Sequence, residues 1–108
     1  MPALSFDITE TAEAVVVALA GELDVRGSAA LDPELRRLAS EPGPPVLVLD
    51  LRGLRFMDSS GLRTVVMADS ALRAEGRRLE LVRGEPEVQR VFEVTRMDER
   101  LTFVDDPS

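Results

Sequence analysis

Four consecutive residues, Asp58-Ser59-Ser60-Gly61, have the most capacity for chemistry, and they follow an apolar stretch at Val46–Leu51. A serine at a helix N-terminus is well placed to carry a phosphate, because free N–H groups and the positive end of the helix dipole stabilise negative charge. Asp and Ser are also preferred N-cap residues, and on spacing alone a plain cap is the commoner explanation. A glycine in the first turn costs about 1 kcal/mol relative to alanine, which indicates that another backbone approaches Gly61 closely.

Other kinds of catalytic site are disfavoured by composition. The sequence has no Cys and no His, which removes thiolate nucleophiles, disulfides, the usual general base and the commonest metal ligands. A small acid–base enzyme would have to rely on carboxylates such as Asp24 and Asp58. We therefore expect no catalytic activity, no metal and no cofactor.

Length and charge set further bounds. The 108 residues suit a single domain over 1–108, and 44% hydrophobic residues suffice for a core. The net charge of −7 disfavours direct binding to nucleic acid and to anionic membranes. No basic-then-apolar leader precedes residue 11, and no apolar run approaches the roughly 20 residues of a membrane span. These features predict a cytoplasmic protein.

The first half of the chain predicts two strands and a helix. Alternating apolar residues predict a strand over Leu4–Ile8, and the apolar run Ala14–Ala20 predicts a strand covered on both faces. Gly21–Asp24 then forms an exit loop. Leu31, Leu35 and Leu38 have helical spacing, but Pro33 restricts where that helix begins.

Two starts are compatible with Pro33. Either Asp32 is the N-cap and Pro33 the first helical residue, which we favour, or the helix begins at Ser28 and kinks. The proline-rich segment 41–45 ends the helix in both cases.

The second half alternates strands and helices. Val46–Leu51 predicts a buried strand, and Asp58 to Gly61 opens a helix that ends near Gly76. Further elements are a strand at Leu79–Val82, a helix from Pro86 with Val88, Val91, Phe92 and Thr95 on its buried side, and a strand at Leu101–Val104. The fold class is thus α/β, with an antiparallel opening hairpin, then alternating helices and strands that complete a mixed sheet packed against helices.

The stretch VLVLDLRGLRFMDSSGL resembles the signature of the STAS domain, found in bacterial anti-sigma factor antagonists and in sulfate transporters. Gly21-Glu22-Leu23-Asp24 after the second strand and Pro86 before Val91-Phe92 also match that family. The resemblance extends over the whole chain, from about Leu4 to Val104.

The resemblance implies a phosphorylation switch. The phosphoacceptor of such antagonists is the Ser after the motif Asp, which is Ser59 here, with Asp24, Asp58, Ser60 and Gly61 around it. An anti-sigma factor serine kinase would donate the phosphate and a serine phosphatase would remove it. The unphosphorylated antagonist would bind the anti-sigma factor and release the sigma factor. The alternative is a non-switching STAS subunit that scaffolds a complex or regulates lipid or anion transport.

Two arginines depart from the family pattern. Arg63 lies four residues after Ser59, where many relatives have a small residue, and it either reaches the phosphate or is a solvated surface charge. Arg96 occupies a place where relatives often have Gly, and we expect an altered turn there.

Two further pairs of residues have ordinary explanations. Arg77 and its neighbour Arg78 are expected to be solvated charges at a helix end. Phe56 and Met57 precede the motif, and each could belong either to a partner surface or to a hydrophobic staple, which is the commoner role.

Overall fold

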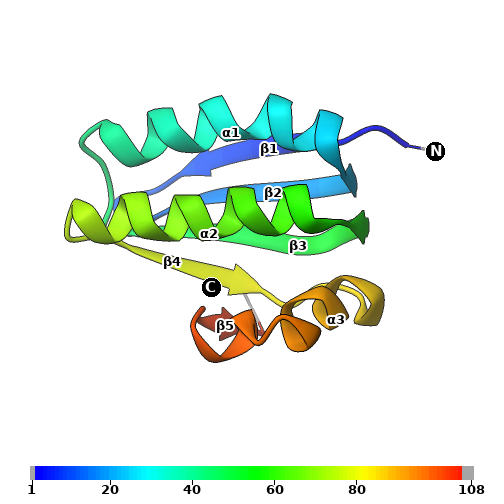
Figure 1. Ribbon diagram of the computed structural model, residues 1–108. Helices are drawn as coiled ribbons and strands as arrows, with labels where there is room; N and C mark the ends of the chain where they lie inside the picture. Colours follow the sequence, from blue (N-terminus) through cyan, green and yellow to red (C-terminus); the bar gives the residue numbers. More distant parts are fainter. Residues whose placement is uncertain (1, 106–108) are drawn as a thin grey trace.

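The computed structural model describes residues 2–105 and contains a five-stranded mixed sheet with strand order β1-β2-β3-β4-β5 (Figure 1). The elements follow in the order β1 (Ser5–Glu10), β2 (Ala14–Leu23), α1 (Val25–Ser40), β3 (Val46–Met57), α2 (Ser59–Ala74), β4 (Arg78–Val82), α3 (Pro86–Val94), the 3-10 turn η1 (Met97–Glu99) and β5 (Phe103–Val104). β1 pairs with β2 antiparallel, and every other pairing is parallel. The predicted fold class and element order are confirmed, with η1 added.

One face of the sheet carries the main core. Odd-numbered residues of β2, and of β3 as far as Leu51, point to this face, among them Val17, Leu49 and Leu51, each fully buried. Figure 1 shows α1 and α2 side by side across this face, and Phe92 of α3 joins the same core. Apolar residues at every second strand position therefore meet helices on one side only.

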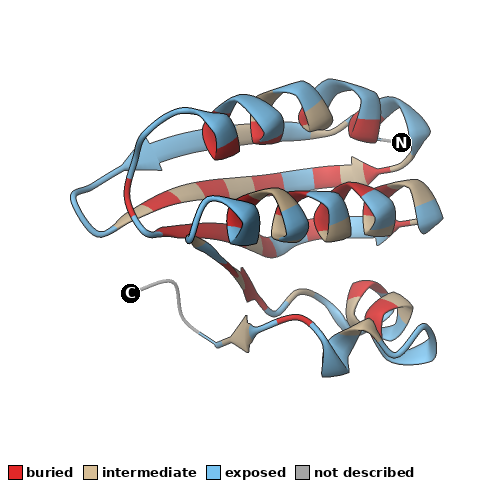
Figure 2. Cartoon of the chain, turned by 60° about the vertical axis from the view of Figure 1, so that its left-hand side comes forward, coloured by how far each residue is buried: buried red, intermediate tan, exposed pale blue. Residues whose placement is uncertain are grey.

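Within the described residues, the opposite face of the sheet has a small cluster of buried residues, Val46, Val48 and Val82. β2 has a strand on each side, but its second face is half-buried rather than covered, so the prediction of burial on both faces is wrong. Figure 2 shows the resulting alternation along this strand. Beside the cluster, the Arg52 guanidinium donates two hydrogen bonds to the Asp50 carboxylate, from Nη2 over 2.8 Å and from Nε over 2.9 Å. These hydrogen bonds lower the pKa of that carboxyl.

Both predicted starts of α1 are wrong. The helix begins at Val25, and Asp24 is its N-cap, accepting a hydrogen bond from the Gly27 N–H over 2.8 Å. Pro33 lies inside the helix on its exposed side, and Ala29, the residue whose carbonyl loses its partner, is exposed as well. The predicted exit loop is also wrong up to Leu23, because β2 continues to that residue.

Several other boundaries differ from the prediction. β3 continues past Leu51 to Met57, and irregular pairing with β2 accommodates the extra residues. β5 contains only the last two residues of the predicted strand at Leu101–Val104, although Leu101 itself is buried. Thr95 is exposed and its hydroxyl donates to the Val91 carbonyl, so its prediction as a buried helix residue is wrong.

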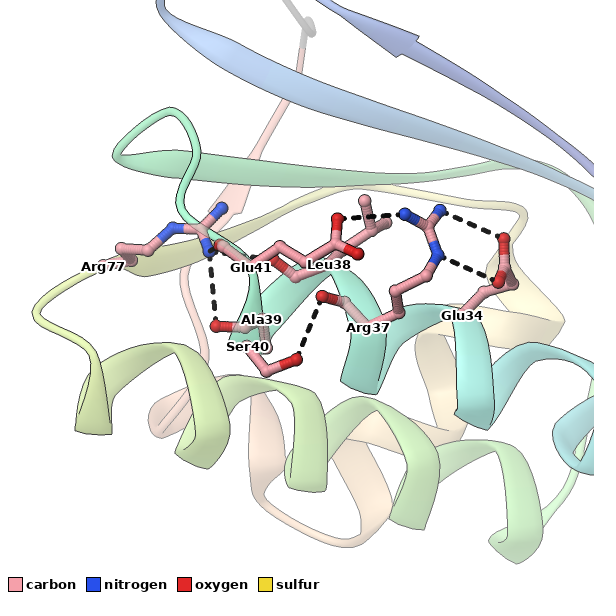
Figure 3. A network of polar contacts seen from close by, with 7 residues as sticks. All are labelled: Glu34, Arg37, Leu38, Ala39, Ser40, Glu41 and Arg77. Carbon is pink, nitrogen blue, oxygen red and sulfur yellow. Dashed lines mark hydrogen bonds and ion pairs between the residues drawn. The ribbon is translucent and has the colours of Figure 1, made fainter.

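Arg77 joins two parts of the fold that are far apart in the sequence (Figure 3). Its Nη1 donates to the carbonyls of Leu38 and Glu41, over 2.8 and 3.2 Å, and its Nε donates to Pro44 over 2.9 Å. These carbonyls lie at and beyond the last turn of α1, where helix C-termini leave acceptors unpaired. Arg77 therefore caps α1 and is not the solvated charge that the sequence suggested.

Arg96 adopts the left-handed conformation, with φ of +62°, directly before η1. This region favours glycine, because the Cβ of other residues is strained there. The chain therefore makes this turn with a positive φ at a residue other than glycine, at a conformational cost.

Candidate functional site

Two aspartates lie at the carboxyl ends of the adjacent parallel strands β2 and β3. Leu23 and Met57 are register partners, so the residues that follow them, Asp24 and Asp58, begin α1 and α2 at neighbouring points of one sheet edge. The Asp58 N–H also donates to the Leu23 carbonyl over 3.3 Å. Loops at this edge of an open α/β sheet are the usual place for a site.

Asp58 is the N-cap of α2. Its Oδ1 accepts hydrogen bonds from the N–H groups of Ser60 and Gly61 over 2.9 and 3.3 Å, and its carbonyl accepts from Leu62. The first-turn N–H groups expected to be free for a phosphate are thus already paired with a carboxylate at Ser60 and Gly61. A phosphate on Ser59 would lie next to that carboxylate and compete with it.

The two serines of the motif differ in exposure. Ser59 is exposed, and we find no hydrogen bond to its hydroxyl from any residue between 2 and 105. Ser60 is half-buried and lines a hollow between α1 and α2. Because Asp58 supplies the cap, the Ser59 side chain has no structural task in the described part of the chain and is open to a partner.

Gly61 fits against the end of β2. A Cβ at this position would lie 2.8 Å from the carbonyl oxygen and Cγ of Leu23 and 2.7 Å from Cγ of Met57. The close backbone approach expected from the sequence is confirmed. Only glycine allows the first turn of α2, and with it Ser59, to lie this close to the two strand ends.

The charges beside Ser59 have both signs. Asp24 and Asp58 are half-buried, whereas Arg63 is exposed on α2 with no ion pair to another described residue. The sequence-predicted residues Asp24, Asp58, Ser59 and Gly61 thus lie at one edge of the sheet, with Arg63 one helical turn further along α2. Within residues 2–105, no group of three or more acidic side chains could hold a metal ion.

Two exposed apolar side chains lie at the same edge. Val25, directly after Asp24, is 66% exposed, and Phe56, two residues before Asp58, is 42% exposed. Met57 is buried as expected of a staple, but Phe56 is not. Exposed apolar residues around a polar centre are typical of protein interfaces. Sequence inspection missed Val25, although it follows an N-cap aspartate just as Ser59 does.

Comparison with known proteins defines the family. A family model described as Mlab, STAS domain, matches residues 6–105. The chain belongs to the STAS domain family. Within residues 2–105, none of its helices has the length and apolar character needed to cross a membrane.

Solved structures with this STAS fold include named antagonists of anti-sigma factors. An anti-sigma factor antagonist from Mycobacterium paratuberculosis is 23% identical with a TM-score of 0.87, covering 97% of this chain and 88% of its own. Unphosphorylated SpoIIAA is 26% identical with a TM-score of 0.80, covering 93% and 88%. The SulP transporter STAS domain from Vibrio cholerae is 22% identical with a TM-score of 0.65, covering 89% and 76%.

Proposed function

We propose that this STAS protein is an anti-sigma factor antagonist controlled by phosphorylation of Ser59. The observation that carries the proposal is the exposed hydroxyl of Ser59, which has no hydrogen bond within residues 2–105 while Asp58 caps α2. The similarity to unphosphorylated SpoIIAA supports it. In its unmodified form the chain binds a serine-kinase anti-sigma factor, and the sigma factor is released.

Phosphorylation would change the charge of the binding face sharply. A phosphoserine carries about −1.5 to −2 charges at neutral pH. Asp24 and Asp58 already contribute negative charge at this edge, so a partner surface that fits a neutral hydroxyl would instead meet a concentrated negative charge. A coupling of 1–3 kcal/mol corresponds to roughly 5–150-fold in affinity, which is enough to dissociate a partner.

The other residues of the edge have supporting roles. Gly61 keeps the first turn of α2 close to the strand ends, and Ser60 faces α1 beside the acceptor. In this proposal the chain is the protein substrate of a serine kinase and a serine phosphatase, and catalysis belongs to those partners. It acts in the cytoplasm, where the kinase, ATP and the sigma factor are present.

The proposal is tested by incubating the protein with the serine-kinase anti-sigma factor of the same genome and ATP, followed by peptide mass mapping. We expect one phosphate, on Ser59, and none on the Ser59→Ala variant. The Ser60→Ala variant serves as the matched control and is expected to be modified like the wild type. Absence of phosphate from the wild-type protein would refute the switch, and phosphate on Ser60 would refute the assignment of the acceptor.

A second candidate is a non-switching STAS subunit of a larger complex, such as a regulator of lipid or anion transport. The similarity to the STAS domain of a SulP transporter favours it. The exposed Ser59 hydroxyl favours the switch instead, because a scaffold has no need of it. A protein that co-purifies in a stable complex and is never phosphorylated at Ser59 would support the second candidate.

A further inference from the structure

A groove runs between α1 and α2, beginning next to the phosphoacceptor. It consists of two adjoining hollows of about 280 and 170 Å³, and both are lined by Asp32, Arg36 and Met67. Ser60, the neighbour of Ser59, lines the larger hollow. The groove therefore continues the candidate site along the helical face of the molecule.

The end nearest Ser59 is lined by hydroxyl groups. Ser28, Ser60 and Thr64 all line the larger hollow, and Ser28 is only 7% exposed. The Ser28 Oγ has no hydrogen bond within residues 2–105, but it is closed off from solvent, so a partner cannot reach it. The Thr64 hydroxyl also has no hydrogen bond within residues 2–105 and is not closed off in this way, so a ligand atom that bonds to it would gain a contact that the free protein lacks.

The charge at this end favours an acidic group. Arg36 is paired with Asp32 over 2.8 Å, but Arg63 has no such partner among residues 2–105. Arg63 also lines the larger hollow, and its positive charge is therefore available on a chain of net charge −7. A carboxylate there would accept hydrogen bonds from the guanidinium and from the hydroxyls beside it.

The far end of the groove is apolar. Leu35, Ala68 and Ala71 line the smaller hollow with Met67, whose side chain is 47% exposed. Methionine adapts its shape to apolar partners and is common on binding surfaces. This end suits a single aliphatic side chain.

The two ends are one helical turn apart, since Arg63 and Met67 are separated by four residues of α2. We propose that the groove binds a helix of the anti-sigma kinase that presents a carboxylate at Arg63 and Thr64 and, one turn along, an aliphatic side chain at Met67. This inference rests on the proposed function, because it names the surface through which that partner is held. Residues three or four apart on the docking helix would supply both groups.

The position of Arg63 links this surface to the switch. Ser59 and Arg63 are four residues apart on α2, so a phosphate on Ser59 can pair with the Arg63 guanidinium. The phosphate would then compete with the partner's carboxylate for the same arginine and repel that carboxylate directly. Release of the partner would therefore require no change of fold.

Calorimetric titration of the variants with the kinase tests the groove. We expect Arg63→Glu and Met67→Asp to weaken binding at least tenfold. The matched controls Arg90→Glu and Val94→Asp make the same changes at exposed positions of α3, away from the groove, and are expected to bind within about twofold of the wild type. Circular dichroism confirms that each variant is folded.

The variant Thr64→Val, which removes the hydroxyl and nearly keeps the shape of the side chain, gives a second and more specific test. Loss of a hydroxyl that has no partner should leave the melting temperature unchanged or raise it, while removal of one hydrogen bond should weaken kinase binding by about 2–12-fold. Wild-type affinity in Thr64→Val and in both groove variants would overturn the groove and leave the Ser59 switch intact. A wild-type protein that neither binds the kinase nor is phosphorylated by it would overturn both proposals.

Discussion

Replacement of Gly61 by alanine tests whether the first turn of α2 is held against the strand ends by close packing. The new Cβ would lie 2.8 Å from the carbonyl oxygen of Leu23 and 2.7 Å from Cγ of Met57. The Leu23 carbonyl is held in place by the hydrogen bond from Asp58, so it cannot move away without breaking that contact. The helix must therefore shift or the two strand ends must separate.

The expected magnitude follows from two opposing effects. Overpacking of a well-packed site costs typically 1–3 kcal/mol, and contacts with a backbone atom belong at the upper end of that range. Alanine is favoured over glycine within a helix by about 1 kcal/mol. The net loss in the free energy of unfolding is therefore about 2 kcal/mol, which corresponds to a fall in Tm of roughly 10 °C for a domain of this size.

Urea denaturation followed by far-ultraviolet circular dichroism measures this loss, because the sequence has no Trp or Tyr to report by fluorescence. The matched control is Gly43→Ala, where the Cβ would lie 3.3 Å from Nη2 of Arg77 and 4.0 Å from the carbonyl oxygen of Glu41. We expect the control to stay within about 0.5 kcal/mol of the wild type. A Gly61→Ala variant as stable as the wild type would refute this account of the site.

Three further substitutions test the roles of other residues. Asp58→Ala should lower the free energy of unfolding by about 1 kcal/mol through loss of the α2 cap, and Asp58→Ser should restore most of it; equal urea midpoints for all three proteins would contradict the cap. Arg77→Ala should cost about 2 kcal/mol, since it leaves the carbonyls of Leu38, Glu41 and Pro44 without this donor, whereas Arg78→Ala should cost less than about 0.5 kcal/mol; similar thermal melts of the two variants would argue against the capping role. Arg96→Gly should stabilise the protein by about 1 kcal/mol, because it relieves a positive φ, and a lower Tm would disprove the strain.

Much of the fold could be predicted because local patterns agreed with tertiary packing. The alternation of apolar residues and the proline-rich segment between α1 and β3 were enough to order the elements. The start of α1 could not be predicted from Pro33, because an exposed proline is tolerated inside a helix whose buried stripe is continuous. The role of Arg77 also escaped prediction, since its acceptors are 33 to 39 residues away in the sequence.

The residues that form the site could be predicted better than the contacts between them. The close approach at Gly61 followed from the cost of glycine in a helix, and the structure confirms it. The pairing of Ser60 and Gly61 with the Asp58 carboxylate was not foreseen, because a string of Asp and Ser residues leaves open which of them is the cap. Val25 was overlooked, since nothing in a single apolar residue after a strand shows that it will be exposed.

The most direct test of the central claim is the affinity of the serine-kinase anti-sigma factor for the protein before and after phosphorylation of Ser59. Both forms are prepared from the same protein and titrated by calorimetry at one ionic strength, with Ser59→Ala treated in parallel. We predict that the unmodified protein binds and that the phosphorylated form binds roughly 5–150-fold more weakly, while Ser59→Ala keeps its affinity after treatment. Equal affinity of the phosphorylated and unmodified forms would contradict the switch.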